Sequence, residues 1–406
     1  MQNDYKSVQR TYLSRSWAEV DLDAIKHNIK EIKASLRKKT EIMGVVKADA
    51  YGHGVLEVAR TLIESGVTRL AVSMLDEAIQ LRKCGITVPI LILSYTDPAR
   101  AGEIIEYNVT QTIYSHDLAK SLSAEAVKRN TAIKVHVKID TGMSRVGFCL
   151  GYQAVKDVMI INELPGIIIE GIFTHFSKAD ETDKEYTLLQ FDRFINFCAE
   201  LERIGILIPI KHVANSAAVM SYPEMQLDMV RPGIIQYGLY PSKEVDQTAL
   251  NLKPAMSLKS NVIMVKSVEK DTLISYGGIF KTQRDSVIAT LPIGYADGYS
   301  RLLSNKSRVL INGEYAPVVG RICMDQCMAD VTDIVKKGID VKVGDETVIF
   351  GTQLDSAGIE HSISIDELAD IIGTINYELI CIIGKRIPRI YLRNGKICDV
   401  LNYLLG

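Results

Sequence analysis

The sequence lacks an excess of charge of either sign. Its 406 residues carry 47 Lys and Arg against 49 Asp and Glu, a formal net charge of −2, and no basic stripe is present. Nucleic acid is therefore not an expected partner. The seven cysteines include no C-x-x-C pair, which argues against a disulfide framework or a cysteine-based metal site and favours a reducing compartment.

Long hydrophobic runs are also missing. No apolar stretch reaches the roughly 18–20 residues that span a membrane, and the N-terminal residues have no apolar core of the kind found in a secretory signal. We therefore expect a cytoplasmic protein without a membrane partner.

The length and the apolar pattern predict a two-domain α/β chain. A chain of 406 residues is too long for one ordinary domain. Eight apolar runs rich in Ile and Val, typical of strands buried on both faces, lie at residues 42–46, 70–74, 88–93, 109–114, 133–139, 167–173, 208–213 and 229–235. Helical patterns separate most of them, for example at 76–84, 117–129 and 185–204. Eight such units predict a (β/α)8 TIM-type barrel over residues 18–252, with a doubly wound open sheet as the alternative.

The pattern changes after about Pro254. Short alternating runs follow, separated by turn residues, and Asn312-Gly313 and Asn394-Gly395 are typical of hairpin turns. A helical pattern covers 365–372. We predict a mainly β C-terminal domain over 253–406, joined by an N-terminal strand at about 10–17.

A barrel carries its functional groups at the carboxyl ends of its strands. Lys47 follows the first apolar run directly, and a lysine desolvated there has a lowered pKa and can act as a nucleophile or base. The glycines of Gly52-His53-Gly54 allow close approach to a ligand. Other polar residues end later runs or enter the loops that follow them (Lys138, Asp140, Arg145, His175, His212, Asn215 and Ser216), and Arg231 lies within the eighth run.

Seven stretches together resemble the bacterial alanine racemases, fold-type III pyridoxal phosphate enzymes. The stretches are VVKADAYGHG (45–54), HVKIDTGMSR (136–145), GIFTHF (171–176), MVRPGI (229–234), ISYGG (274–278), LPIGYADGY (291–299) and VGRICMDQ (319–326). The resemblance runs from about Trp17 to Tyr391.

The resemblance implies a complete set of groups for pyridoxal 5'-phosphate. Lys47 matches the lysine that holds the cofactor covalently, and Arg231 matches the arginine paired with the pyridine nitrogen. An arginine stays charged, so it will not fully protonate that nitrogen. The other matching residues are Tyr51, Ser216, the Gly233 and Ile234 amides and Tyr377 at the phosphate, together with His175 and Asn215.

The resemblance also implies a two-base reaction in a homodimer. Lys47 would serve one face of a flat intermediate, and Tyr276, from the second domain of the other subunit, would serve the opposite face. Arg145 and the Met324 amide match the contacts to the substrate carboxylate. Lys138 occupies a position where many members carry a carbamylated lysine. No metal is expected.

The function implied is interconversion of L- and D-alanine, supplying D-alanine for peptidoglycan. A serine or broad-specificity racemase of the same fold and a non-catalytic pyridoxal phosphate carrier are the alternatives. Tyr377 and Tyr295 match residues that narrow the substrate pocket, which favours alanine, and the second domain with Tyr276 argues against the carrier. We assign no role to His27, His53, His116 and His361, which we expect to be surface or capping residues.

Overall fold

The computed structural model describes residues 13–405. The chain divides into two compact units. The barrel unit comprises Ala24–Tyr51 and Val55–Lys253, and the C-terminal unit comprises the described residues up to Asp23, Gly52–Gly54 and Pro254 onward. Residues 18–23, which the sequence placed in the barrel, group instead with the C-terminal unit. The strand expected at about 10–17 lies partly outside the described residues, and β1 spans Ser16–Asp21.

The barrel unit is built on one parallel sheet with the strand order β10-β2-β3-β4-β5-β6-β8-β9. The strands are β2 (Glu41–Val45), β3 (Arg69–Val72), β4 (Ile90–Ile92), β5 (Thr110–Ile113), β6 (Ile133–Asp140), β8 (Ile167–Phe173), β9 (Ile210–His212) and β10 (Met229–Val230), and the short β7 (Phe148–Cys149) pairs with β6. All the residues of β4 are buried, on both faces of the strand, as expected when both faces of a sheet are covered.

The sheet curls until its two edge strands meet. The Asp228 N–H donates to the Lys211 carbonyl at 3.2 Å, and the Arg231 N–H donates to the Ala214 carbonyl at 3.0 Å. These bonds join the segments that carry β9 and β10, so the predicted barrel is nearly closed. The last strand is shorter than its apolar run, because residues 234–237 form a 3-10 turn.

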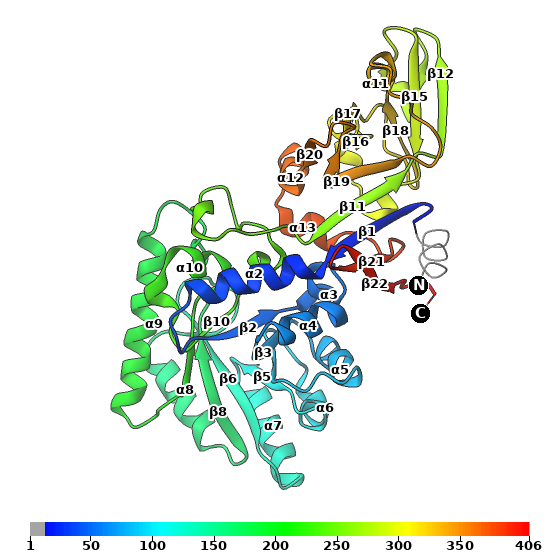
Figure 1. Cartoon of the computed structure of the whole chain (residues 1–406). Coiled ribbons are helices and arrows are strands. Elements are labelled where there is room, and N and C mark those ends of the chain that lie inside the picture. The colour runs from blue at the N-terminus through cyan, green and yellow to red at the C-terminus, as the bar shows by residue number, and fades with distance from the viewer. Residues whose placement is uncertain (1–12, 406) are drawn as a thin grey trace. The chain divides into compact units, whose positions relative to one another are not determined.

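Helices follow most of the strands and lie on the outside of the sheet (Figure 1). They are α2 (Leu22–Ser35), α4 (Val55–Glu64), α5 (Leu75–Lys83), α6 (Ala101–Glu106), α7 (His116–Lys128), α8 (Tyr152–Glu163), α9 (Glu185–Arg203) and α10 (Ser216–Ser221). Each predicted helix agrees with the structure to within a few residues. No helix in residues 13–405 is long and apolar enough to cross a membrane.

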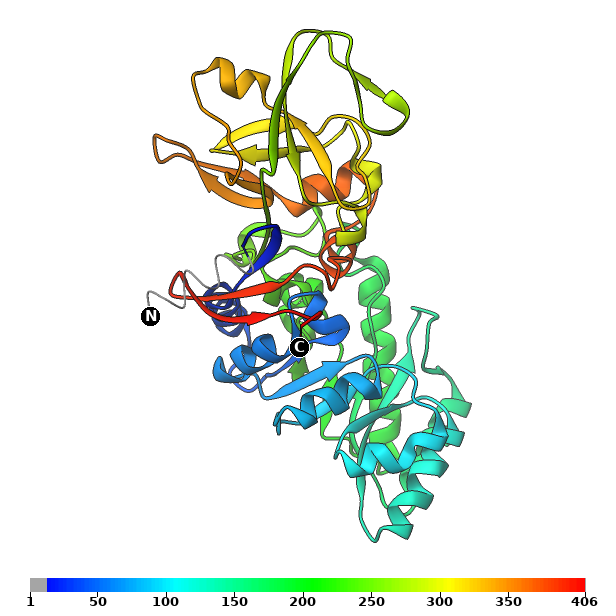
Figure 2. The same cartoon turned by 90° about the vertical axis from the view of Figure 1, so that its right-hand side faces the viewer.

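The C-terminal unit is mainly β. Its largest sheet has the path β17-β16-β19-β11-β1-β21-β22, in which β1 pairs antiparallel with β11 and parallel with β21. The blue β1 and the red β21–β22 hairpin lie side by side in both views (Figures 1 and 2). The strands are β11 (Met256–Asn261), β12 (Met264–Val268), β13 (Leu273–Ile274), β14 (Phe280–Lys281), β15 (Ser286–Leu291), β16 (Arg308–Ile311), β17 (Glu314–Pro317), β18 (Cys327–Asp330), β19 (Glu346–Leu354), β20 (Glu360–Ile363), β21 (Arg389–Arg393) and β22 (Lys396–Leu401), and the helices are α11 (Thr332–Lys336), α12 (Ile365–Ile372) and α13 (Asn376–Cys381).

Both predicted hairpin turns are present in this unit. Asn312-Gly313 joins β16 to β17 with φ values of 53° and 78°, and Asn394-Gly395 joins β21 to β22 with 51° and 67°. Two successive positive φ angles match the twist of antiparallel strands, and Asn followed by Gly adopts them most readily.

Candidate active site

The predicted barrel residues gather where the strands end. Lys47 follows β2, Lys138 lies near the end of β6, and His175 follows β8. The charges of Arg231, Arg145, Lys138 and Lys47 all act on the His175 ring. Burial first, and then these cations, hold the pKa of His175 well below its usual range, so its imidazole is neutral at neutral pH.

Arg231 is the most tightly held of these groups. Its Nη1 donates to the His212 carbonyl, and its Nη2 donates to the carbonyls of Thr174 and Val213, at 2.8–3.1 Å. Nη2 also lies 3.4 Å from His175 Nδ1. The side chain is only 4% exposed, and burial together with Arg145 lowers the pKa of Arg231 to about 9. Arg231 is therefore still charged at neutral pH, and the orientation of its guanidinium group is fixed by these hydrogen bonds.

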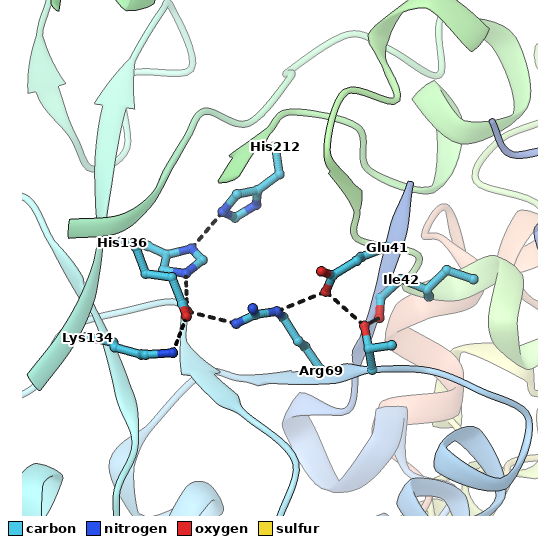
Figure 3. A network of polar contacts seen from close by, with 8 residues as sticks. Glu41, Ile42, Arg69, Lys134, His136 and His212 are labelled. Atoms are coloured by element: carbon cyan, nitrogen blue, oxygen red, sulfur yellow. Dashed lines mark hydrogen bonds and ion pairs between the residues drawn. The ribbon is translucent and has the colours of Figure 1, made fainter. Parts of the chain in front are cut away.

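A buried line of hydrogen bonds runs from Arg231 through two histidines to a carboxylate, and Figure 3 shows the part of it from His212 onward. Arg231 Nη1 lies 2.9 Å from His212 Nδ1, His212 Nε2 lies 2.8 Å from His136 Nδ1, and His136 Nε2 lies 3.4 Å from Glu170 Oε2. An arginine only donates, so His212 Nδ1 accepts and its proton is on Nε2. By the same reasoning, His136 accepts at Nδ1 and donates to Glu170 from Nε2. We call this line the histidine line.

Two cations balance Glu170 at the far end of the histidine line. Arg69 Nη1 and Lys134 Nζ lie 2.8 and 2.6 Å from its oxygens, and Arg69 also contacts Glu41 at 3.1 Å. Burial alone would raise the pKa of the Glu170 carboxyl. The hydrogen bonds from His136 and Lys134 and the charge of Arg69 outweigh burial and hold that pKa well below its usual range. The carboxylate is therefore ionised.

A bulge explains why Glu170 reaches this position. The β6–β8 register passes from Val135↔Ile169 to His136↔Gly171, which leaves Glu170 as an extra residue. A bulge of this kind redirects a side chain. The neighbouring Gly171 leaves room for the histidine, because a Cβ there would lie 2.5 Å from the His136 ring.

Lys138 lies in an unusual environment for a lysine. It is 4% exposed, its Nζ donates to the Ile139 carbonyl at 2.9 Å, and it lies over the Phe173 ring. Burial first and Arg231 next lower its pKa to about 7. A large fraction of the amine is therefore neutral and nucleophilic at neutral pH.

The loop to Arg145 is held by a single carboxylate oxygen. Asp140 Oδ1 accepts the N–H groups of Gly142, Met143 and Ser144 at 2.8–3.1 Å. Arg145, an exposed residue, follows directly. Asp140 therefore fixes the loop from which the guanidinium projects.

Three predicted phosphate-binding residues converge. Ser216 Oγ accepts the Gly233 N–H at 2.8 Å. A Cβ on Gly233 would lie 2.7 Å from the Tyr51 hydroxyl and 3.7 Å from Ser216 Oγ. Two hydroxyls thus lie close to the backbone of Gly233, where a side chain would clash with the Tyr51 hydroxyl, and such a cradle of hydroxyls and backbone fits a phosphate group. Asn215, by contrast, uses its Oδ1 as the N-cap of α10, accepting the Ala218 N–H at 3.0 Å.

The predicted residues of the C-terminal unit form their own cluster. Tyr276, Met324 and Tyr295 are 71%, 52% and 42% exposed. Their loops are bonded together: the Tyr295 N–H donates to the Cys323 carbonyl at 3.1 Å, and Ser275 Oγ donates to the Arg321 carbonyl at 2.6 Å. The unit therefore presents these three side chains on exposed, interlinked loops. Tyr377 lies in α13.

The histidine line was missed from the sequence. His136 and His212 stood in the quoted runs but received no role, and Glu170 was not singled out. The one available signal was a polar residue within an otherwise apolar strand. A surface position, one of the two expected for His53, was wrong, because that residue is fully buried.

Two family models cover most of the chain. "Alanine racemase, N-terminal domain" matches residues 20–241, and "Alanine racemase, C-terminal domain" matches residues 255–391. A curated relative, alanine racemase 1 of Clostridium acetobutylicum, is 51% identical over 96% of this chain and 98% of its own length.

Solved structures agree with these matches. The alanine racemase of Clostridium difficile 630 is 44% identical, with a TM-score of 0.89, over 96% of this chain and 98% of that one. The alanine racemase of Bacillus anthracis with bound L-Ala-P is 38% identical, with a TM-score of 0.89, over 97% of this chain and 99% of that one.

Proposed function

Because this chain belongs to the alanine racemase family, we propose that it interconverts L- and D-alanine with pyridoxal phosphate, using Lys47 and Tyr276 as its two bases. The chain is an amino-acid isomerase. Members of the family are typically homodimers that provide D-alanine for peptidoglycan, and we assign the same role here. The observation that carries the proposal is the arrangement of the barrel around Arg231 and the Tyr51–Ser216–Gly233 cradle.

The barrel supplies the groups that would hold the cofactor. Lys47 would attach it covalently, and Arg231 would face its ring nitrogen. Its phosphate would be bound by Tyr51, Ser216, Tyr377 and the Gly233 and Ile234 amides. Bound pyridoxal phosphate supplies an electron sink that acidifies the Cα–H bond of an amino acid. Arg231 would temper that sink, because a guanidinium that is charged at neutral pH would hydrogen-bond to the ring nitrogen without fully protonating it.

Racemisation needs one proton acceptor on each face of the substrate. Lys47 Nζ would take or return the proton on one face, and Tyr276 Oη would do so on the other. The neutral His175, held by Arg231, would support Tyr276 by hydrogen bonding.

We further propose that Tyr276 acts on the barrel of a second copy of the chain. The side chains of Tyr276, Met324 and Tyr295 are exposed on this unit, as a surface awaiting a partner would require. Exposed aromatic groups and methionine are favoured at interfaces. The active site would then be complete only in the homodimer.

Arg145 and the Met324 amide would bind the substrate carboxylate. Arg145 and Arg231 are both cationic, so the buried Lys138 beside them is best accommodated without its positive charge. A neutral Lys138 amine can add to CO2, forming a carbamate anion and releasing one proton. The anion would then orient Arg145.

The experiment is a cofactor and turnover measurement on the purified enzyme. We expect visible absorbance from lysine-bound cofactor and faster racemisation of L-alanine than of L-serine. Faster turnover of L-serine would replace the alanine assignment, and bound cofactor without turnover of either would indicate a carrier. Absence of the absorbance in the enzyme given excess pyridoxal phosphate would contradict the role of Lys47.

A further inference from the structure

The backbone directly after Lys47 winds in the left-handed sense. Ala48, Asp49, Ala50 and Tyr51 have φ angles of 53°, 55°, 54° and 53°, and the first three have ψ angles of 49°, 47° and 51°. The Ala50 N–H donates to the Val46 carbonyl at 2.9 Å, which closes one turn. Residues other than glycine enter this region singly and at a cost. Four in succession form a strained turn.

A carboxylate from the next βα unit holds this turn. Glu77 Oε1 accepts the Ala48 N–H at 2.6 Å, while Oε2 accepts the N–H groups of Ser73 and Met74 at 2.7 and 3.1 Å. One carboxylate thus joins the strained turn to the start of α5. The turn has a second anchor where Asp49 Oδ1 accepts the Val55 N–H at 2.8 Å.

The turn separates the two residues that would hold opposite ends of the cofactor. Lys47 precedes the turn just after β2, and Tyr51 ends it with a hydroxyl close to Gly233. Strained conformations persist only where the surrounding structure imposes them, and they concentrate at functional sites. A turn of the usual hand would lead the chain along a different path from Lys47 to Tyr51.

We propose that Glu77 is a positioning residue, which clamps the left-handed turn so that Lys47 and Tyr51 converge on one ligand. The inference rests on the proposed function of those two residues. It predicts that loosening the clamp speeds loss of pyridoxal phosphate, and that removing the strain at Ala48 compensates.

The strain itself is tested by glycine substitution. Ala48 is exposed, so Ala48→Gly leaves no cavity, and glycine adopts positive φ freely. We expect the unfolding equilibrium constant of the holoenzyme to fall roughly tenfold. The matched control is Ala124→Gly, at an exposed alanine in the right-handed helix α7, where the constant should rise about fourfold. Effects of the same sign would overturn the claim of strain.

The clamp is tested by Glu77→Gln. A carboxamide has one acceptor oxygen, so it cannot bind both Ala48 and the start of α5. We expect pyridoxal phosphate to dissociate several-fold faster into a buffer containing a carbonyl trap, and Glu77→Gln/Ala48→Gly to recover most of that difference. Glu57→Gln is the control, because Glu57 is also half-buried in the first turn of a helix and pairs with Arg60.

The outcomes distinguish failure of the positioning role of Glu77 from failure of the proposed function. Equal dissociation rates for Glu77→Gln and Glu57→Gln, or no recovery with Ala48→Gly, would overturn the positioning role. If the wild-type enzyme held no cofactor, the proposed function would fail instead. The clamp would then be judged by unfolding alone, where Glu77→Gln should destabilise the otherwise wild-type protein more than it destabilises the Ala48→Gly variant.

Discussion

Replacing Glu170 by Gln should destabilise the barrel substantially. Glu170 is 7% exposed and accepts from Arg69, Lys134 and His136. Gln has one acceptor oxygen, and its NH2 group would face a cation. The ion pair with Lys134 adds little to the free energy of unfolding, because the Lys134 side chain is 57% exposed. Loss of the Arg69 pair, at 14% exposure, and of the buried His136 contact should cost about 3 kcal/mol of unfolding free energy.

The unfolding free energy lost in Glu170→Gln should become smaller as the pH falls. The pKa of Glu170 is depressed in the folded protein, so its contribution is complete above the unfolded value near 4.3 and fades as the pH falls through the lower folded value. The wild-type advantage over Glu170→Gln should therefore be constant near neutral pH and shrink below about pH 4.

Chemical unfolding of the holoenzyme, followed by circular dichroism at fixed protein concentration, measures this difference. The control is Glu41→Gln, which removes the other carboxylate on Arg69. Glu41 is 42% exposed, and we expect a loss of less than about 1 kcal/mol. Equal losses in the two variants, or a Glu170 effect that grows on acidification, would refute the reasoning.

The remaining predictions concern the chemistry. Tyr276→Phe should slow exchange of the α-proton of L-alanine by roughly 10²- to 10⁴-fold and that of D-alanine far less; equal loss of both, measured by NMR in D2O, would contradict the two-base assignment. With 13C-bicarbonate, the enzyme should show a carbamate signal that disappears on acidification below a pH of about 7, the pKa of Lys138, and that is absent from Lys138→Met; a signal in both proteins would exclude Lys138. Ser216→Ala should weaken cofactor binding about tenfold, measured by titration of the cofactor-free enzyme; unchanged affinity would remove Ser216 from the cradle.

Much of the barrel could be predicted because its strands are short, apolar and separated by periodic helices. The end of β10 could not, because residues 234–237 are buried in a 3-10 turn whose apolar composition resembles that of a strand. The grouping of β1 with the C-terminal unit depends on its pairing with β21, which is far away in the sequence. The hydrophobic pattern of neighbouring residues carries no information about such a pairing.

The candidate site divides in the same way. Lys47, Lys138 and His175 could be located because each lies at or just after the end of an apolar run. Glu170 could not, because its position depends on a register shift between β6 and β8, and period-two alternation assumes that no such shift occurs. The left-handed turn after Lys47 also escapes sequence reasoning, since alanine does not normally adopt it.

The most direct test of the two-base, two-subunit account is a hybrid dimer. Lys47→Ala and Tyr276→Phe should each be nearly inactive alone. If the bases come from different chains, equal amounts unfolded together and reassembled with pyridoxal phosphate should regain about a quarter of the wild-type racemase activity, since half of the dimers are hybrids with one intact site. No activity above the sum of the separate variants would contradict the account, because both bases would then belong to the same chain.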